Sequence, residues 1–196
     1  VVQVSNVNES PVFTSANAPS VFENQTFVTE LNATDPENDN LAYSIAYGDD
    51  QALFNLNVAT GALSFKTPPD FENPNDANTD NLYELTVQVS DGEHNATLNL
   101  SVSVTGINEP PVFTSQPNLN MSEGQTMVGE LNATDPDQDL ITYSITGGPD
   151  QAKFEINATS GILSFKNAPD FEANSSAAGD NAYVLTVRAS DGTAEA

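Results

Sequence analysis

Apolar and polar residues alternate along several short segments of this chain, the pattern of a half-buried β-strand. The clearest examples are residues 83–89, 98–104 and 41–45, and Phe27 and Leu31 are spaced to share one face of a further strand. No segment shows a sustained helical period. The pattern therefore predicts an all-β chain.

Turn-forming sequences separate these segments, for example Asp35-Pro36-Glu37-Asn38-Asp39-Asn40 and Pro74-Asn75-Asp76. The 12 prolines and 11 glycines agree with a chain that turns often. About seven short strands per hundred residues, each polar on one side, predict an antiparallel Greek-key β-sandwich of immunoglobulin-like shape.

The sequence repeats itself once, with a constant offset and no insertion. Pro11-Val12-Phe13-Thr14-Ser15 recurs at 111–115, and the segment Glu30 to Pro36 recurs unchanged at 130–136. A repeat of this length suits an independently folding domain rather than one unit of a solenoid. The predicted organisation is the end of a preceding repeat over residues 1–8, a first repeat over 9–108 and a second over 109–196.

The two copies are cut differently. Residues 1–5 align with residues 101–105, at the end of a last strand, whereas the second copy stops at Ala196, before the counterpart of Leu98 to Val104. We therefore expect the second sandwich to lack most of its final strand and to expose an edge. Two outcomes are open: residues 1–5 of a neighbouring molecule add to that edge as a strand, or the edge is distorted.

Large aromatic residues occur at matching positions of both copies and are expected in the two cores. In the first copy they are Phe13, Phe54, Phe65, Phe71 and Tyr83.

The net charge of the chain limits the kinds of partner that it can bind. The chain has 28 acidic and 4 basic residues, a formal net charge of −24. Nucleic acid is excluded as a partner because its binding requires basic side chains, and an anionic membrane surface is disfavoured for the same reason. Two explanations remain, a solvated acidic surface and a set of sites for a hard cation such as Ca²⁺.

Several kinds of chemistry lack the residues that they need. The chain has no cysteine, no tryptophan and a single histidine, His94, which we expect to be a loop residue. Paired carboxylates can hydrolyse glycosides, but such a site needs a cleft for sugar stacking, and these acids recur in both copies. We therefore expect no enzyme. No apolar run is long enough to span a bilayer.

Acidic residues form five motifs placed in a fixed order around the strands. Asp70 and Glu72 point to the same side of an extended segment, and the prolines after Glu109 stiffen the connector between the copies. An EF-hand is excluded, because its glycine and distal glutamate are missing. In order, the motifs are Glu23, Asp70-x-Glu72, Asn108-Glu109, Asp135-x-Asp137 and Asp191.

These motifs resemble those of the cadherin repeat, over essentially the whole chain and twice. The amino-acid sequences of these motifs are more similar to those of the cadherin-like repeats of large bacterial surface proteins than to those of animal cadherins. The resemblance implies two tandem cadherin-type sandwiches, with Ca²⁺ between them held by both domains and their linker. The implied ligands are Glu23, Asp70, Glu72, Asn108, Glu109, Asp135, Asp137 and Asp191.

The resemblance also implies incomplete sites at the two ends of the chain. The front site could still hold the ion that uses only the linker and the following domain, through Asn8, Glu9, Asp35, Glu37 and Asp91. At the back, Glu123, Asp170 and Glu172 have no linker after them and are expected to bind weakly or not at all. Gly106 and Asn6 stand where the family's linker usually begins with Asp.

The implied function is structural and adhesive: extracellular, calcium-rigidified repeats in the stalk of a cell-surface protein. The partners would be calcium and neighbouring cadherin-like repeats. The alternative is a module of a secreted bacterial protein that binds a polysaccharide or a protein. Strand-swapped adhesion of the animal type is excluded, because it depends on a tryptophan anchor.

Overall fold

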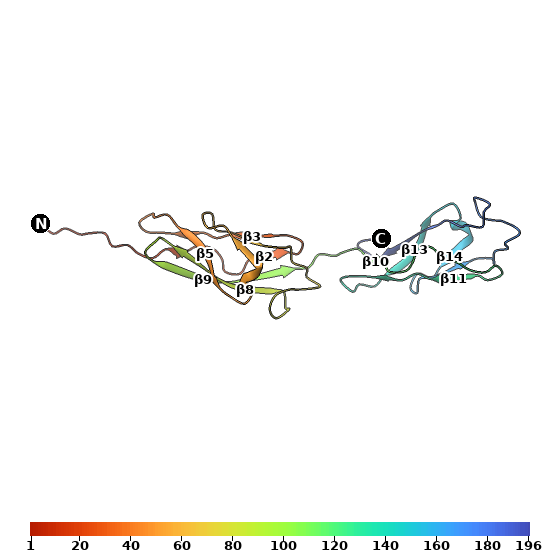
Figure 1. Ribbon diagram of the computed structural model, residues 1–196, viewed down its shortest axis with the longest axis horizontal. Coiled ribbons are helices and arrows are strands. Elements are labelled where there is room, and N and C mark those ends of the chain that lie inside the picture. The colour runs from red at the N-terminus through yellow and green to blue at the C-terminus, as the bar shows by residue number, and fades with distance from the viewer. The chain divides into compact units, whose positions relative to one another are not determined.

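β-Strands make up nearly all the regular structure of this protein, as its computed structural model shows for residues 1–196 (Figure 1). The only helices are two single 3₁₀ turns, η1 (Gln51–Leu53) and η2 (Gln151–Lys153). The chain divides into unit 1, Val1–Ile107, and unit 2, Asn108–Ala196. The predicted all-β class is confirmed. No helix has the length and apolar character needed to cross a membrane.

Unit 1 is a sandwich of two sheets. One sheet has the order β2-β9-β8-β5, in which β2 runs parallel to β9 and the other pairs are antiparallel; the second has the order β3-β7-β6, and β1 pairs separately with β4. The strands are β1 (Val12–Phe13), β2 (Ser20–Phe22), β3 (Phe27–Glu30), β4 (Ala33–Thr34), β5 (Ala42–Tyr47), β6 (Phe54–Leu56), β7 (Ala62–Phe65), β8 (Leu82–Ser90) and β9 (Asn95–Thr105).

The core of unit 1 lies between these sheets. Strand β8 supplies four side chains with at most 2% exposure, those of Tyr83, Leu85, Val87 and Val89, so its predicted core positions are confirmed, although Thr86 is buried as well. The Tyr83 ring meets Phe65 edge-on at 4.9 Å between centroids. Such edge-to-face pairs add to the stabilisation from apolar burial.

Three residues expected to face the cores do not: Phe27, Phe71 and the counterpart of Phe71, Phe171, which is 64% exposed. Phe27 is 58% exposed, because the register of β3 against β7 shifts between Phe27 and Thr29 and brings Val28 into the core instead. A bulge of this kind reverses the faces on which the following side chains lie. Phe71 is 38% exposed and belongs to a loop, where its ring lies against Gly106: a Cβ built on that glycine would be 2.9 Å from the ring.

Unit 2 repeats this plan with fewer strands. Its sheets are β11-β15-β14 and the two-stranded β13-β16, with β10 paired to β12. Neither β2 nor β9 has a counterpart, and β16 begins four residues later than β8 does in repeat numbering. The strands are β10 (Val112–Phe113), β11 (Met127–Glu130), β12 (Ala133–Thr134), β13 (Thr142–Gly147), β14 (Phe154–Ile156), β15 (Ile162–Phe165) and β16 (Thr186–Ser190).

The last residues of unit 2 pair with strand β16 through a single antiparallel bridge, between Ser190 and Glu195. Ala196 and Ala189 exchange two backbone hydrogen bonds, of 3.0 and 2.9 Å, and the Arg188 guanidinium lies 2.7 Å from the Glu195 carboxylate. Beyond this bridge the edge of β16 has no partner, so the Tyr183 and Leu185 side chains are only partly buried.

Candidate metal centres

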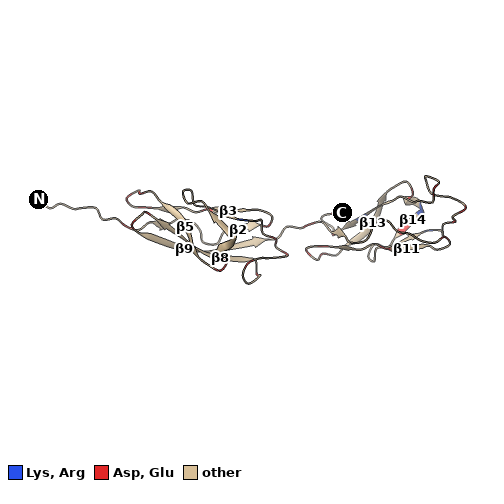
Figure 2. Cartoon of the chain, in the orientation of Figure 1, with Lys and Arg blue, Asp and Glu red and all other residues tan.

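Carboxylates form two groups in each unit of a chain whose acidic residues far outnumber its basic ones (Figure 2). We call the two groups of each unit its head cluster and its tail cluster. The head clusters are Asn8, Glu9, Asp35, Glu37 and Asp91 in unit 1, and Asn108, Glu109, Asp135, Asp137 and Asp191 in unit 2. The tail clusters are Glu23, Asp70 and Glu72 in unit 1, and Glu123, Asp170 and Glu172 in unit 2.

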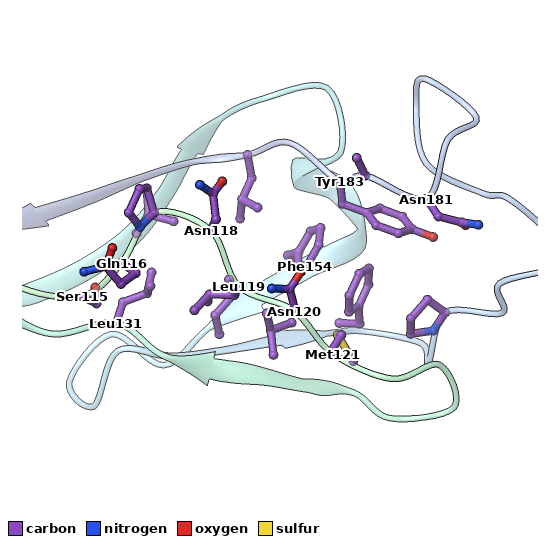
Figure 3. A pocket seen from close by; sticks show the side chains of 18 of the residues that line it. Ser115, Gln116, Asn118, Leu119, Asn120, Met121, Leu131, Phe154, Asn181 and Tyr183 are labelled. Atoms are coloured by element: carbon purple, nitrogen blue, oxygen red, sulfur yellow. The ribbon is translucent and has the colours of Figure 1, made fainter.

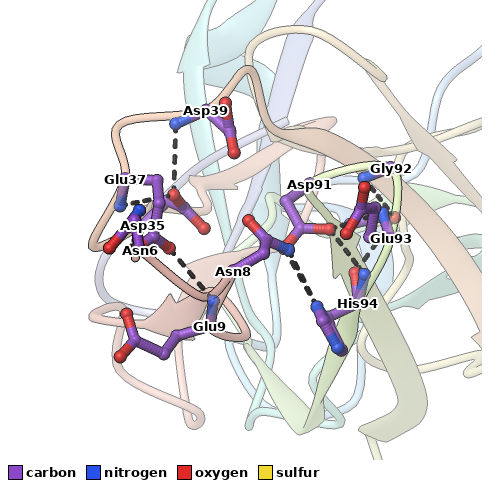
Figure 4. A network of polar contacts seen from close by, with 11 residues as sticks. Asn6, Asn8, Glu9, Asp35, Glu37, Asp39, Asp91, Gly92, Glu93 and His94 are labelled. Atoms are coloured by element: carbon purple, nitrogen blue, oxygen red, sulfur yellow. Dashed lines mark hydrogen bonds and ion pairs between the residues drawn. The ribbon is translucent and has the colours of Figure 1, made fainter. Parts of the chain in front are cut away.

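The loop after β4 positions the first half of the head cluster of unit 1 (Figure 4). The Asp35 Oδ1 atom accepts hydrogen bonds from the backbone N–H groups of Glu37 (2.9 Å) and Asp39 (3.1 Å). This Asx-type turn fixes the loop and leaves the second Asp35 oxygen for another role. Glu37 in turn accepts a bond of 3.0 Å from the backbone N–H of Glu9.

The loop after β8 positions the second half of the head cluster of unit 1. The Asp91 Oδ1 atom accepts the backbone N–H groups of Glu93 (2.7 Å) and His94 (2.6 Å), and its Oδ2 atom accepts the Asn8 side-chain amide at 3.0 Å. Asn8 also lies 2.8 Å from the His94 ring nitrogen (Figure 4). Residues 8 and 9 are therefore bound to both loops, one through its side chain and the other through its backbone.

The carboxylates of this cluster perturb one another. A side-chain hydrogen bond with Glu37 and repulsion from its charge raise the pKa of Glu9. The pKa of Glu37 is lowered, chiefly by the Glu9 backbone N–H. The pKa of Asp91 is also lowered, first by the backbone N–H of His94, because hydrogen bonds to a carboxylate favour its charged form. Glu9 and Glu37 thus repel one another in the absence of a cation.

The head cluster of unit 2 has the same arrangement. The Glu109 backbone N–H donates to Asp137 at 2.9 Å, and the Asn108 side-chain amide donates to the Asp191 Oδ2 atom at 2.9 Å. The pKa of Asp191 is lowered, first by the backbone N–H of Ala194 and then by Asn108. Ala194 replaces His94, so the histidine is not required for this geometry.

In each head cluster, the aspartate of the loop after β4 or β12 has one oxygen without a partner in the protein. The Oδ2 atoms of Asp35 and Asp135 are buried and accept no hydrogen bond. A buried carboxylate oxygen without a partner is unfavourable, because its hydration has been lost and not replaced. Carboxylate and carbonyl oxygens are the ligands that Ca²⁺ takes, so both head clusters fit a calcium ion.

The tail cluster of unit 1 is organised around a buried glutamate. Glu23 is only 2% exposed; its carboxylate accepts the backbone N–H of Phe71 at 3.0 Å and that of Ile107 at 2.7 Å. Oxygens of Glu23, Asp70 and Glu72 lie within 4.8 Å of one another. Three carboxylates this close repel one another unless a proton or a cation intervenes.

The tail cluster of unit 2 has the same three carboxylates within 4.8 Å, but its glutamate is exposed. Glu123 accepts the backbone N–H of Phe171 at 2.8 Å, the counterpart of the Phe71 bond. The second bond, which Ile107 provides in unit 1, has no donor here.

The structure gathers the predicted site residues into these clusters within each unit. Sequence reasoning missed three participants. The contact of His94 with Asn8 has no signal in the repeat, because the second copy has alanine there. Asn6, whose amide donates to Glu37 at 3.3 Å, and the backbone N–H of Ile107 were missed because neither is acidic.

The family model described as Cadherin domain matches residues 16–105 and again 117–196. Among curated proteins, the chain is 33% identical over 171 residues to the Fat-like cadherin-related tumor suppressor homolog of Drosophila melanogaster, with 81% of the chain covered. It is 33% identical over 213 residues to Protocadherin Fat 4 of Mus musculus, with 98% covered.

The chain spans 4% of the length of each of these two relatives. Among solved structures, human Protocadherin-24 EC1-2 is similar in fold, with a TM-score of 0.60 at 21% identity, covering 94% of this chain and 87% of that one. The cadherin-type sandwich fold predicted for both copies is confirmed, although the relatives named here come from animals rather than bacteria. This chain belongs to the cadherin domain family.

Proposed function

We propose that this chain is a pair of calcium-binding cadherin repeats that form part of the adhesive or stalk region of a cell-surface protein. The observation that carries the proposal is the buried, unpartnered Oδ2 oxygen of Asp35 and of Asp135, each in a head cluster whose other residues come from the segment before the unit and from a second loop. A hard cation would supply the missing partner.

The head clusters supply ligands of the right type. In unit 1 the ion would be held by Asp35, Asp91 and Asn8, and in unit 2 by Asp135, Asp191 and Asn108. The pKa of Glu9 is raised by its side-chain hydrogen bond with Glu37 and then by repulsion from the Glu37 charge, and a divalent cation would relieve that repulsion. Ca²⁺ fits better than Mg²⁺, which resists the dehydration that an all-protein site requires.

The tail cluster of unit 1 would complete the centre next to the linker. This part of the proposal is supported by residue order and by the family: Glu23, Asp70 and Glu72 precede the connector Asn108-Glu109, and Asp135, Asp137 and Asp191 follow it. Calcium bound by both groups would restrict the motion of one unit relative to the other. Without it, the carboxylates of a chain with a net charge of −24 would repel.

The expected affinity follows from the proposed location. Extracellular calcium modules bind with dissociation constants of roughly 10⁻⁴–10⁻³ M, close to the calcium level outside cells. The extracellular location and the adhesive role come to this chain from its family. The bacterial type of repeat and the alternative of a polysaccharide-binding module stay predictions, and no observation favours either.

Small-angle X-ray scattering tests the proposed role as a rigid stalk. In excess chelator we expect a broader distribution of interatomic distances than in millimolar calcium. Asp137→Asn should show the broader distribution even with calcium, whereas Glu155→Gln, which removes the same charge from an exposed position of β14, should behave as the wild type. A distribution that is the same in calcium and in chelator would falsify the proposed role.

A further inference from the structure

Sequences of the form Asn-x-Ser/Thr, with a middle residue other than proline, occur nine times in the chain, five in unit 1 and four in unit 2. In secreted proteins such a sequence can accept an N-linked glycan, and the acceptor lies in a surface loop. Two structural conditions separate the nine sites. The local chain must present the asparagine amide, and the site must stay accessible once the sandwich has folded.

Asn157-Ala158-Thr159 meets the first condition. It lies in the turn between β14 and β15, where the Asn157 Oδ1 atom accepts the backbone N–H groups of Thr159 and Ser160, both at 3.0 Å. These bonds span only two and three residues, so this Asx-type turn can form before the sheets assemble. They occupy the side-chain oxygen, and the Asn157 Nδ2 atom makes no hydrogen bond within the protein.

The same turn meets the second condition. Asn157, Ala158 and Thr159 are all exposed. The backbone closes the turn without the Asn157 amide, because the Asn157 N–H donates to the Ile162 carbonyl and the Gly161 N–H donates to the Asn157 carbonyl, both at 2.9 Å. A sugar on the Nδ2 atom would therefore extend into solvent and displace no contact of the fold.

Other asparagines in such sequences are less suited to carry a glycan. The Asn8 amide donates to Asp91 at 3.0 Å and belongs to a head cluster. Asn120 lies beside Met121, which packs against the core of unit 2, and Figure 3 shows both side chains among those that line a pocket of this unit. A glycan at either position would meet groups that already have a place in the fold.

We propose that Asn157 carries an N-linked oligosaccharide. In the transfer, the Nδ2 atom forms a bond to the anomeric carbon of the sugar, this carbon loses its bond to the pyrophosphate of a lipid-linked donor, and one Nδ2 proton is released. The proposal rests on the extracellular location proposed above, because a chain reaches that donor in the secretory pathway.

Unit 1 contains a matched site that lacks one group. The Asn57 Oδ1 atom accepts the backbone N–H groups of Ala59 and Thr60 at 3.0 and 3.1 Å, and Asn57 is exposed. The turn therefore has the same hydrogen bonds as the turn at Asn157. Ala59 stands where unit 2 has Thr159, so the hydroxyl group that the acceptor sequence requires is missing.

A glycan at Asn157 would also protect a strand edge. Strand β14 is the outer strand of the sheet β11-β15-β14, and Asn157 follows it directly. An exposed edge can pair with the edge of another chain. A bulky, hydrated oligosaccharide at the end of β14 would hinder this pairing.

Site mapping of the secreted chain tests the proposal. The full chain, with an added signal peptide, is expressed in cultured animal cells, and protein is recovered from both the medium and the cells. Peptide N-glycosidase in heavy-oxygen water converts each glycosylated asparagine to a labelled aspartate, which peptide mass mapping locates. We expect a label at Asn157 in the wild type and none there in Thr159→Ala, which removes an exposed side chain.

Asn57 supplies both controls. In the wild type its peptide should stay unlabelled, which measures spontaneous deamidation in the same kind of turn. Ala59→Thr completes the acceptor sequence and should add a glycan at Asn57. An unlabelled Asn157 in the wild type, an equal label in Thr159→Ala, or an unlabelled Asn57 in Ala59→Thr would each overturn the proposal.

Calcium titration of the same material separates this inference from the proposed function. Thr159 belongs to neither cluster of unit 2, so Thr159→Ala should bind calcium as the wild type does. Calcium binding by a chain without a glycan at Asn157 would overturn this inference alone. A glycan at Asn157 without calcium binding would overturn the proposed function alone.

Discussion

Tyr83 and Tyr183 occupy the same position in two copies of one sequence, yet only Tyr83 is fully buried. Tyr83 is 0% exposed and its strand β8 pairs with β9, whereas Tyr183 is partly exposed at an edge without that strand, although both rings meet a phenylalanine at nearly the same distance, 4.9 and 4.8 Å. The local sequence thus fixes the aromatic contact. Burial depends on a strand that pairs from further along the chain.

The glutamates of the two tail clusters differ in the same way. Glu23 accepts two backbone N–H groups and is buried, whereas Glu123 accepts one and is exposed. The residue that makes the difference is Ile107, which follows the final strand. The strand that completes the core therefore also fixes the carboxylate at the end of the unit.

Replacing each of the two matching tyrosines with alanine should give the largest difference in stability between the units. Tyr83→Ala should destabilise unit 1 by about 3–5 kcal/mol, as other large aromatic-to-alanine changes in a core do. Tyr183→Ala should cost unit 2 less than half as much, because that ring is already partly hydrated. Amide hydrogen exchange of the intact chain reads each unit separately. Equal losses in the two units would contradict the account of burial.

The paired glutamates should show a smaller difference. Glu23→Gln should destabilise unit 1 by about 2 kcal/mol, because a buried carboxylate that accepts two N–H groups is replaced by an amide that can satisfy only part of this arrangement. Glu123→Gln should change unit 2 by under 1 kcal/mol. The direct measurement is the exchange rate of the Ile107 and Phe71 amides, which should rise in Glu23→Gln alone. Unchanged protection of both amides would show that Glu23 does not hold the linker.

Substitutions at Gly106 and at its counterpart Asn6 should differ in their effect on stability. Gly106→Ala brings a methyl group to within 2.9 Å of the Phe71 ring, which must move, so unit 1 should lose about 1 kcal/mol. This ring explains why the family's usual Asp is not accommodated at 106 without a shift. The matched comparison is Asn6→Ala, at the exposed counterpart position, where only the 3.3 Å hydrogen bond to Glu37 is lost and the effect on stability should be smaller. Equal effects at both positions would rule out the ring contact as the cause.

The smallest expected effect concerns acid pH. The folded pKa of Asp91 and of Asp191 is lowered, so each contributes stability above the unfolded value near 3.9, and this contribution is lost as pH falls through the folded pKa. Asn108→Ala should raise the pKa of Asp191 and leave that of Asp91 unchanged; Asn8→Ala should do the reverse. Carboxyl NMR titrations measure both. A shift of both groups in either variant would mean that the pKa change is not local.

Much of this organisation could be predicted from the sequence. Alternation located β8 and β9, and the repeat showed that every local feature of unit 1 should recur in unit 2. The strand bulge at Phe27 could not be predicted, because nothing in an alternating pattern marks a shift of register. Phe71 was misplaced for a similar reason: its hydrophobicity indicates burial, but the loop that carries it faces the linker rather than the core.

The acidic residues were easier to find than their arrangement. Carboxylates at fixed spacings identified the members of each cluster, because cation ligands must be oxygen-rich side chains. Their backbone partners could not be identified in this way. The N–H groups of Glu9, Ile107 and Glu109 depend on how the linker runs past each loop, which only the three-dimensional structure shows.

Calcium titration of the intact chain by isothermal titration calorimetry tests the central claim most directly. We expect binding in the range of roughly 10⁻⁴–10⁻³ M and a severe loss in Asp35→Asn/Asp135→Asn, which alters the two unpartnered oxygens. Glu30→Gln/Glu130→Gln removes the same charge from exposed positions of β3 and β11 and should bind as the wild type does. No saturable binding by the wild type, or equal losses in the two double variants, would contradict the account.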